Sequence, residues 1–466
     1  MRHACELRTK AAPRFELGIK DLQSSALPLG HAAERESQLP SADRISQSAD
    51  TLVVVCNGHG EDLIALRVLE QLRIHAPSTT LQVLPLVGEG KSFENGVSAG
   101  WLQRIGPCAQ LPSGGFSNQS LKGLAKDLLA GLTLLSWRQW HCLHQAAKQG
   151  AVILAVGDFL PLVMAWSTGG TYGFIGTPKS DFTWRSGPGQ SLSDRYHRLK
   201  GSEWDPWEWA LMRCRRCLLI AVRDKLTARA LHRKGVEAVA PGNPMMDGLL
   251  SEPPPIALKR CRKVLMLCGS RMPEAIVNFK RLLRSLDHLA SDLPVAVLVA
   301  VGSQPNIDQL EQCLASEGYR KSLPPSEAIG AKCCWVKGGR LALIGPGQFN
   351  LWASWAEVGL TTAGTATEQL VGLGIPAVSL PGNGPQFKQG FAKRQSRLLG
   401  GAVLPCQSAQ SLAEKLNELL ENSGLRQRLG EIGQRRMGSA GGSHRLADLI
   451  SKTLLEHPTL SAKNLP

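Results

Sequence analysis

The chain has 466 residues, which is too many for one ordinary domain and fits two or three. Hydrophobic residues make up 43% of it, enough for sizeable cores, and the formal net charge is +15. So large a positive charge favours anionic partners, which include nucleic acids, sugar nucleotides and acidic lipid surfaces. The sequence contains no long Lys/Arg tract, zinc-finger spacing or RNA-binding signature, so we expect no nucleic-acid partner.

Twelve cysteines are scattered along the chain. Cys214 and Cys217 form a C-x-x-C pair, but no second pair completes a zinc site. We interpret the cysteines as buried or free thiols of a reducing compartment, with a metal site as the alternative. No apolar run reaches 18 residues and no secretory hydrophobic segment is visible. The expected location is the cytoplasm, with attachment to the cytoplasmic face of the membrane left open.

The chain begins with a polar stretch, residues 1–50, that lacks sustained periodicity and is expected to be a disordered extension. A continuous apolar run over 51–56 then predicts a buried parallel strand. A Gly-rich loop and a predicted helix over 63–74 follow, which is how a doubly wound domain opens. Two residues of that loop, His59 and Asp62, are candidate catalytic bases. A purely local hydrogen-bonding role is the alternative for the histidine.

Further strands of this first domain, residues 51–250, are predicted over 81–87, 151–156, 171–175 and 217–222. Asp158 follows one of them, and the carboxyl end of a parallel strand faces the ligand in doubly wound sheets. We therefore predict Asp158 as the general base, with capping of the next helix as the alternative. The region 121–148 reads as a long helix. Its apolar face is assigned to the core, with a membrane-facing role as the alternative.

A second doubly wound domain is predicted over residues 261–455, with strands over 264–268 and 295–301 and a helical tail. Gly269, Ser270 and Arg271 follow the first of these strands. Glycine and serine there offer backbone and hydroxyl donors at a helix start, and arginine offers a forked cation suited to a diphosphate.

The clearest single unit is a strand over 357–361, a small-residue turn, a helix over 365–373 and a strand over 376–380. Gly364 at the helix start would let backbone amides approach a ligand closely. The helix N-terminus carries unpaired N–H groups and partial positive charge, which suits a phosphate. Glu368 lies one turn further on, where its carboxylate could reach a ribose diol.

The segment from Ala363 to Glu368, followed by Gly374-Ile375-Pro376, resembles the donor-site signature of GT-B glycosyltransferases. Within that fold the chain is most similar to lipid-A-disaccharide synthase, and more distantly to the peptidoglycan glycosyltransferase MurG. Two positions depart from the synthase pattern: Asn243 stands where a histidine is expected, and Cys268 stands where a proline is expected.

The resemblance implies an α/β GT-B fold, in which two Rossmann-like domains face each other across a cleft. It also implies transfer of a sugar from a nucleotide donor, a UDP-sugar, to a lipid-linked acceptor at a membrane surface. GT-B enzymes stabilise the departing diphosphate with helix dipoles, amides and basic side chains, so no metal or other cofactor is expected. The predicted catalytic residues are Asp158, His59 and Asp62, and the predicted substrate-binding residues are Ser270, Arg271, Gly364, Thr365, Ala366, Glu368 and Gln386.

Two other classes of function stay open at this point. The departures at Asn243 and Cys268 are compatible with a non-catalytic regulatory protein that keeps a sugar-nucleotide pocket at a membrane. A nucleotide-sugar epimerase or hydrolase on the same fold would process the donor without any acceptor. Formation of a homodimer is also left open.

Overall fold

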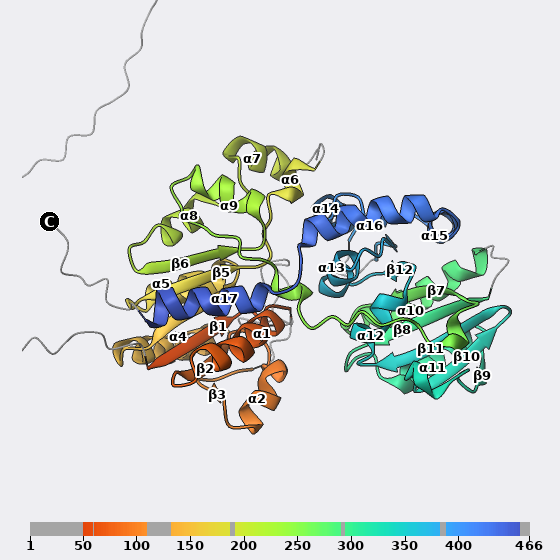
Figure 1. Ribbon diagram of the computed structural model, residues 1–466, viewed down its shortest axis with the longest axis horizontal. Helices are drawn as coiled ribbons and strands as arrows, with labels where there is room; N and C mark the ends of the chain where they lie inside the picture. Colours follow the sequence, from red (N-terminus) through yellow and green to blue (C-terminus); the bar gives the residue numbers. More distant parts are fainter. Residues whose placement is uncertain are drawn as a thin grey trace, which may run out of the picture. The chain divides into compact units, whose positions relative to one another are not determined.

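The computed structural model describes residues 50–58, 60–109, 132–186, 192–289, 294–382 and 388–456 (Figure 1). Two predicted site residues, His59 and Gln386, therefore lie outside the described residues. So do residues 1–49 and residues 121–131 of the helix predicted over 121–148. Within the described ranges, no helix combines the length and the hydrophobicity that spanning a membrane requires.

The first half of the chain forms a six-stranded parallel sheet with the strand order β3-β2-β1-β4-β5-β6. Its central strands are continuous apolar runs, such as Val-Ile-Leu-Ala-Val in β4, because both faces of the sheet are covered. The predicted strands are confirmed to within two residues at each end. The strands are β1 Thr51–Cys56, β2 Thr80–Pro85, β3 Gln103–Arg104, β4 Val152–Gly157, β5 Tyr172–Gly176 and β6 Cys217–Val222.

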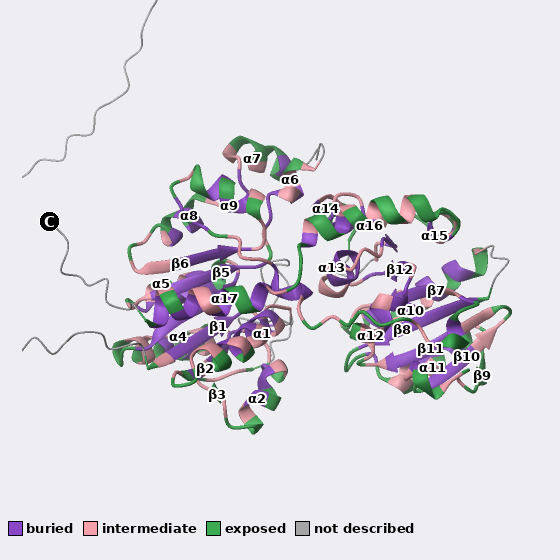
Figure 2. Ribbon diagram, viewed as in Figure 1, coloured by how far each residue is buried: buried purple, intermediate pink, exposed green. Residues whose placement is uncertain are grey.

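The helices of this half are α1 Gly60–His75, α2 Glu94–Ser98, α4 Leu132–Lys148, α5 Phe159–Ser167, α6 Phe182–Arg185, α7 Leu192–Lys200, α8 Pro206–Met212 and α9 Lys225–His232. Several of them, among them α1, α4, α5, α8 and α9, pack against the sheet, whereas α7 packs against α6 away from it (Figure 2). Helix α1 begins at Gly60, three residues before its predicted start. Acidic residues are favoured in the first turn of a helix, and Glu61 and Asp62 occupy that turn.

The second half forms an eight-stranded sheet with the order β14-β13-β12-β7-β8-β11-β10-β9. Its pairs are parallel except at one edge, where β10 lies antiparallel to both β11 and β9. The sequence analysis assigned no element to that edge. The strands are β7 Arg262–Leu267, β8 Val295–Val301, β9 Arg320–Ser322, β10 Cys333–Lys337, β11 Arg340–Pro346, β12 Val358–Thr361, β13 Ala377–Ser379 and β14 Val403–Pro405.

The helices of the second half are α10 Glu274–Ser285, α11 Ile307–Ser316, α12 Phe349–Trp355, α13 Thr365–Gly372, α14 Gln389–Leu398, α15 Ala409–Glu421, α16 Ser423–Met437 and α17 Gly442–Ile450. The predicted strand–turn–helix–strand unit is present as β12, α13 and β13. The predicted helical tail is present as α15, α16, α17 and a final π-helical turn, η7, at Ser451–Leu455.

The end of the tail packs against the first sheet, although the sequence analysis grouped it with the second domain. Helix α17 lies beside α1, and η7 reaches β6 (Figure 1). The reason is a stripe of apolar residues at helical spacing, Leu446, Ile450 and Leu454, which are buried in the same cluster as Leu52 and Leu69. The chain thus returns to its first domain after completing the second.

Candidate functional site

The strand order of each sheet reverses at one point, and doubly wound proteins bind ligands outside the carboxyl ends of the strands at such a point. In the first sheet the reversal lies between β1 and β4, and in the second between β7 and β12. The segments that follow these four strands contain Asn57, Asp158, Arg271 and Gly364. Sequence-predicted residues therefore lie at both switch points.

Asp158 is the N-cap of α5. Its Oδ1 accepts hydrogen bonds from the backbone N–H of Leu160 at 3.1 Å and from Nδ2 of Asn57 at 2.5 Å. The second bond joins the ends of the two strands at the first switch point. Because both bonds use Oδ1, the carboxylate is fixed in orientation. The second oxygen, Oδ2, accepts neither of them, so the cap and the general base predicted from sequence are compatible in one residue.

Asp62, the other predicted base that the structure describes, lies in a different environment. Its side chain is buried and Oδ1 accepts a hydrogen bond from Sγ of Cys56 at 3.0 Å, back toward β1. Burial raises the pKa of Asp62 to about 6, and the bonds from Cys56 and Gly58 lower it in part. This geometry favours a structural role, because the carboxylate turns into the core of the first domain.

Glu61 is a site residue that the sequence analysis missed. Burial raises its pKa to about 7, with further contributions from the negative charges of Asp158, Asp62 and Glu368. Those three carboxylates come from α1, from the end of β4 and from α13, so Glu61 lies where the pieces of the site meet. The available signal was its place directly after the Gly58-His59-Gly60 loop, but only the three-dimensional structure brings it near Glu368.

We expect Glu61→Gln to change how stability depends on pH. Because the folded protein holds a proton on Glu61 with a pKa about 7, above the ordinary 4.5, this group favours the folded state at low pH. Its contribution is complete below about pH 4.5 and is lost as the pH rises through 7. The variant should therefore be more stable than the wild type at pH 8, by roughly 1 to 3 kcal/mol, with little difference at pH 4.5.

Denaturant unfolding at both pH values measures this effect. Glu70→Gln is the matched control, since Glu70 is an exposed glutamate on the same helix. An equal change in stability at pH 4.5 and pH 8 for Glu61→Gln would show that the carboxyl group does not titrate in this range.

At the second switch point, the turn between β12 and α13 is held by its own side chains. The hydroxyl of Thr361 accepts from the backbone N–H of Ala363 at 3.0 Å and lies 2.5 Å from that of Thr367. Nε2 of Gln395 donates to the carbonyl oxygens of Ala363 and Gly364 at 3.3 and 3.1 Å. The turn is therefore fixed before any ligand arrives, as a preorganised binding site requires.

The start of α13 is open. A Cβ at Gly364 would meet nothing closer than the Phe391 ring at 3.9 Å, and its φ of −88° is one that any residue adopts. The glycine thus leaves space above the helix end rather than relieving backbone strain. The next residue pair, Thr365 and Ala366, is half-buried, and the methyl group of Ala366 packs on the core, so its backbone N–H is the group left for a ligand.

The loop after β7 lies directly beside this turn. The backbone N–H of Thr362 donates to the Leu267 carbonyl at 2.9 Å, and a Cβ at Gly269 would lie 3.7 Å from the Thr362 carbonyl oxygen. Gly269 has a φ of +88°, a left-handed conformation that favours glycine. Ser270 is exposed, and Arg271 is half-buried, with a pKa lowered by burial to about 10. Arg271 is still a cation at neutral pH.

Two contacts join the site residues of the two domains. A Cβ at Gly60, the first residue of α1, would lie 2.8 Å from Oγ1 of Thr365, the first residue of α13. Nη2 of Arg223, the residue after β6, donates to Oε2 of Glu368 at 2.8 Å. The starts of two helices that the sequence places three hundred residues apart are thus in contact, and Arg223 is a second site residue that the sequence analysis missed.

The departures from the synthase pattern lie in buried positions. Asn243 is 3% exposed, and its Oδ1 caps the short 3-10 helix η3, Pro244–Met246, by accepting from the Met245 N–H at 3.1 Å. Cys268 is 1% exposed, and burial raises its thiol pKa to about 12. Asn243 also lines a small cavity, and its Nδ2 is buried with no hydrogen-bond partner among the described residues.

A tryptophan cluster over 204–209 and the C-x-x-C pair lie in the first half of the chain. Trp204 and Trp209 are buried, whereas Trp207 is 54% exposed. Cys214 and Cys217 are free thiols, and burial raises the pKa of Cys217 to about 12. Across the described part of the chain, no three His, Cys, Asp or Glu side chains are grouped as a metal site would need.

Comparison with known proteins identifies the fold. No family model matches the chain, and no curated protein matches it. Solved structures do match, at low identity. A protein assigned as a UDP-N-acetylglucosamine 2-epimerase from Listeria monocytogenes has a TM-score of 0.53 and 12% identity, over 87% of this chain and 97% of that one.

Two glycosyltransferases match to the same extent. CalG4, the calicheamicin glycosyltransferase, has a TM-score of 0.53 and 16% identity, over 88% of this chain and 99% of its own. A UDP-glucosyltransferase from Polygonum tinctorium has a TM-score of 0.52 and 14% identity, with 88% and 99% covered. Together with the two doubly wound domains and their switch points, these similarities show that the chain has the GT-B fold.

Proposed function

We propose that the protein transfers a sugar from a UDP-sugar to a lipid-linked acceptor, as the resemblance to lipid-A-disaccharide synthase implies. The observation that carries the proposal is the contact between the start of α1 and the start of α13. That contact supports a site in which the start of α13 would bind the phosphates at the switch point of the second domain, and Asp158, with its oriented carboxylate, would act at the switch point of the first. The matched structures include proteins named for UDP-sugars, which supports uridine as the base.

In this proposal the second domain binds the donor. The free N–H groups at the start of α13 and the guanidinium of Arg271 receive the diphosphate, with Ser270 as a hydroxyl donor beside them. Negative charge builds up on the diphosphate as the bond to the sugar breaks, and these fixed positive groups stabilise it. Glu368 accepts hydrogen bonds from the ribose, and Gln386, outside the described residues, is proposed to contact the sugar.

The first domain activates the acceptor. Asp158 takes the proton from the attacking hydroxyl through Oδ2 while Oδ1 stays bonded to Leu160 and Asn57. The same arrangement forms one bond, from the acceptor oxygen to the anomeric carbon, and breaks one bond, from that carbon to the diphosphate. The proton remains on Asp158 until solvent removes it.

An apolar face beside Asp158 supports a lipid acceptor. Helix α5 starts at the carboxyl end of β4, and α4 runs antiparallel to β4, so its first turns lie at the same end of the sheet. Exposed apolar side chains gather on these helices, which contact each other, and on α8, which contacts α5. They are Leu134, Trp137, Phe159, Leu160, Trp166 and Trp207.

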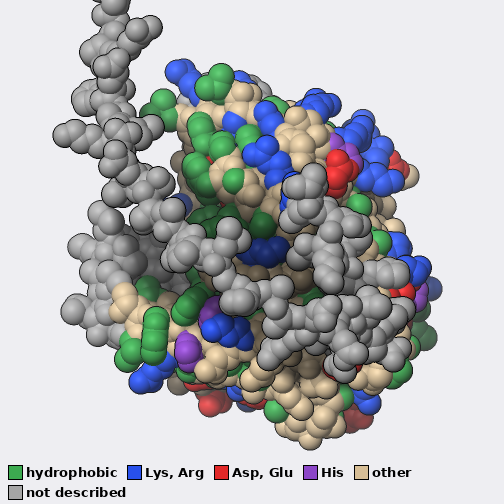
Figure 3. Space-filling model, turned by 90° about the vertical axis from the view of Figure 1, so that its left-hand side faces the viewer, with side chains coloured by type: hydrophobic (Ala, Val, Ile, Leu, Met, Phe, Trp, Pro, Cys, Tyr) green, Lys and Arg blue, Asp and Glu red, His purple; other side chains and the backbone are tan. Residues whose placement is uncertain are grey.

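Only two residues of α4, Gln139 and Leu143, are buried. The apolar face of this helix was predicted to lie in the core, but the helix packs against the core along one narrow side only. Exposed apolar side chains on helices that contact one another support a surface that meets a lipid or another protein. Figure 3 shows hydrophobic and basic side chains side by side on one face of the molecule, a combination that suits an anionic lipid surface. With the net charge of +15, this supports a peripheral position on a membrane.

A second candidate function is epimerisation or hydrolysis of the UDP-sugar, favoured by the matched epimerase structure. It needs no acceptor, so consumption of UDP-sugar in the absence of lipid separates it from transfer. The third candidate, a non-catalytic pocket, predicts nucleotide binding with no consumption of UDP-sugar under either condition.

The donor is tested by thermal unfolding in the presence of UDP, GDP, CDP, ADP and dTDP. A ligand that binds only the folded protein raises its stability by about 2.7 kcal/mol at a hundredfold excess over its dissociation constant. We expect UDP to give the largest rise in melting temperature. A larger rise with another nucleotide would contradict the UDP assignment, and no rise with any of the five would contradict the proposed function.

We expect sugar transfer to survive chelation by EDTA. A helix start and Arg271 supply the positive charge that the diphosphate needs, and the sequence has no Asp-x-Asp motif of the kind that binds a catalytic metal. Initial rates with and without EDTA should agree within a factor of about two. Loss of activity that Mg²⁺ or Mn²⁺ restores would contradict this mechanism.

A further inference from the structure

The side chain of Arg223, a residue of the first domain, contacts Glu368, the residue proposed to bind the ribose. It follows β6 at the carboxyl end of the first sheet, and its Nη2 donates to Oε2 of Glu368 on α13 at 2.8 Å. The side chains are 6% and 15% exposed, respectively. The ion pair is therefore largely shielded from solvent, while Glu368 keeps a partly exposed side chain.

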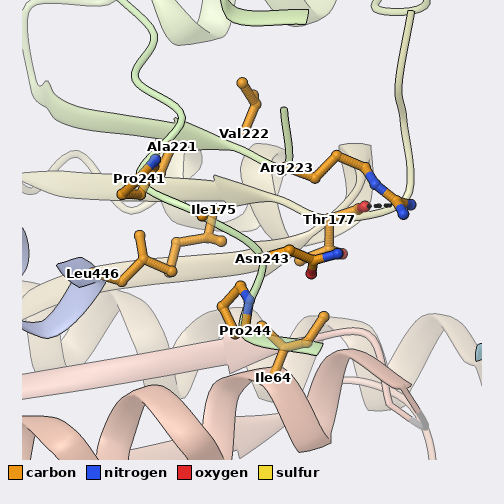
Figure 4. Close-up of a pocket in the computed structure, with 12 residues that line it drawn as sticks. Ile64, Ile175, Thr177, Ala221, Val222, Arg223, Pro241, Asn243, Pro244 and Leu446 are labelled. Atoms are coloured by element: carbon orange, nitrogen blue, oxygen red, sulfur yellow. Dashed lines mark hydrogen bonds between the residues drawn. The ribbon is translucent and has the colours of Figure 1, made fainter. Parts of the chain in front are cut away.

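The other contacts of Arg223 hold the guanidinium in place. Nη1 donates to the carbonyl oxygen of Thr177 at 3.5 Å, after β5, and Nη2 also lies 3.4 Å from Sδ of Met437 on α16. Figure 4 shows the bond to Thr177 at the edge of a small cavity, which Asn243 and Ile64 also line. Arg223 is thus anchored by the backbone of its own domain while its guanidinium bonds the carboxylate of the other.

A buried ion pair is weak evidence for stability, because removing two charges from water costs about as much as their attraction returns. Such a pair does fix orientation. Arg223 holds one oxygen of Glu368, Oε2, and Oε1 accepts no hydrogen bond from another side chain in the described ranges. The bond to Oε2 favours one orientation of the carboxylate and leaves Oε1 for a further donor.

We propose that Arg223 is a positioning residue for nucleotide recognition: it orients Glu368 so that the carboxylate accepts hydrogen bonds from the ribose hydroxyls. This inference rests on the proposed function, since it requires a ribonucleotide at α13. Through this contact, a residue of the first domain contributes to the preference for ribose over deoxyribose without itself touching the ribose. A purely structural Arg223 would join the domains and have no effect on this choice.

The test compares binding of UDP and 2′-deoxy-UDP by calorimetry in the full-length protein. The wild type should prefer UDP, because a hydrogen bond to a charged group contributes about ten- to a hundredfold in affinity. The ratio of the two dissociation constants in Glu368→Gln gives the preference for UDP that remains when the carboxylate charge of Glu368 is removed. We expect Arg223→Met to lose most of the preference. Arg223→Lys should retain a part of it, because a single ammonium group fixes a carboxylate less well than a planar fork.

Arg67→Met is the matched control. Arg67 also joins separate segments, since its Nη1 donates to the carbonyl oxygens of Pro244 and Met245 at 2.8 and 2.9 Å, but no bond links it to Glu368. Its removal should leave the ratio of the two dissociation constants unchanged. The ratio is the decisive quantity, because a general loosening of the domains weakens both ligands alike.

The outcomes are distinct. A wild type that prefers UDP, with the same ratio in Arg223→Met and Arg223→Lys, overturns the inference and leaves the proposed function standing. If Arg223→Met does not fold, as judged by circular dichroism, an unchanged ratio in Arg223→Lys overturns the inference by itself. A wild type that does not bind UDP overturns both.

Discussion

Asp158→Asn is expected to lower the rate of sugar transfer by about 10²- to 10⁴-fold while UDP binding and stability stay close to wild type. Asparagine keeps a carbonyl oxygen that can cap the Leu160 N–H and accept from Asn57, the two bonds that Oδ1 of Asp158 makes. What the change removes is the capacity to accept a proton, so the loss should appear in turnover and not in donor binding.

Asp158→Ala is the matched variant, because it removes the cap as well as the base. Loss of a helix cap costs about 1 kcal/mol, so only the alanine variant should unfold at a lower denaturant concentration. Turnover and denaturant unfolding of both variants separate the two roles. An active Asp158→Asn would place the base elsewhere, with Glu61 next to be examined because of its half-buried position beside Asp158 and Glu368.

Arg271→Met is expected to lower the maximal rate of transfer by about 10²- to 10³-fold. Arg271 lies on the loop after β7, and the backbone of that loop at Gly269 runs beside the turn that starts α13, where the leaving diphosphate is proposed to gain charge. The helix start remains in the variant, so binding of UDP should weaken less than the rate. Steady-state kinetics with saturating acceptor measure both effects, and a lower kcat with a smaller change in KM is the pattern of an interaction made in the transition state.

Arg284→Met controls for loss of an arginine from the same region. Arg284 lies at the far end of α10, the helix that follows Arg271, and pairs with Glu317 on the surface. Its removal should leave the kinetics unchanged, since exposed ion pairs contribute little. If Arg271→Met raised KM with kcat unchanged, Arg271 would bind donor and transition state equally.

Apolar runs and turn residues in the sequence correctly predicted several strands and helices. The strand over Val295–Val301 was predicted with both ends correct, because a run of alternating valine and alanine admits little else inside a parallel sheet. The unit of β12, α13 and β13 followed from its turn and its apolar runs. The antiparallel edge β9–β11 was not assigned. Strand β9 has three residues and is exposed along its whole length, whereas β11 is as long as β8 and was overlooked.

The candidate site was predictable where a residue follows a strand and was missed where residues meet only in three dimensions. Asp158 and Arg271 could be found because each comes directly after an apolar run. Arg223 also follows a strand, but its meaning depends on Glu368, which is 145 residues away. Asp62 shows how local structure changes the surroundings of a predicted residue: its loop pattern suggested a base, and in the structure it lies in the first turn of α1 with its side chain bonded to Cys56.

The central claim, transfer of sugar from a UDP-sugar to lipid, is tested most directly with radiolabelled donor. The full-length protein is incubated with labelled UDP-N-acetylglucosamine or UDP-glucose and with vesicles that contain a sugar-bearing anionic lipid, and organic extraction separates lipid from free sugar. We predict label in the lipid fraction that requires both protein and vesicles and falls at least about a hundredfold with Asp158→Asn. Label released as free sugar or as an isomeric UDP-sugar at the same rate without vesicles would contradict it.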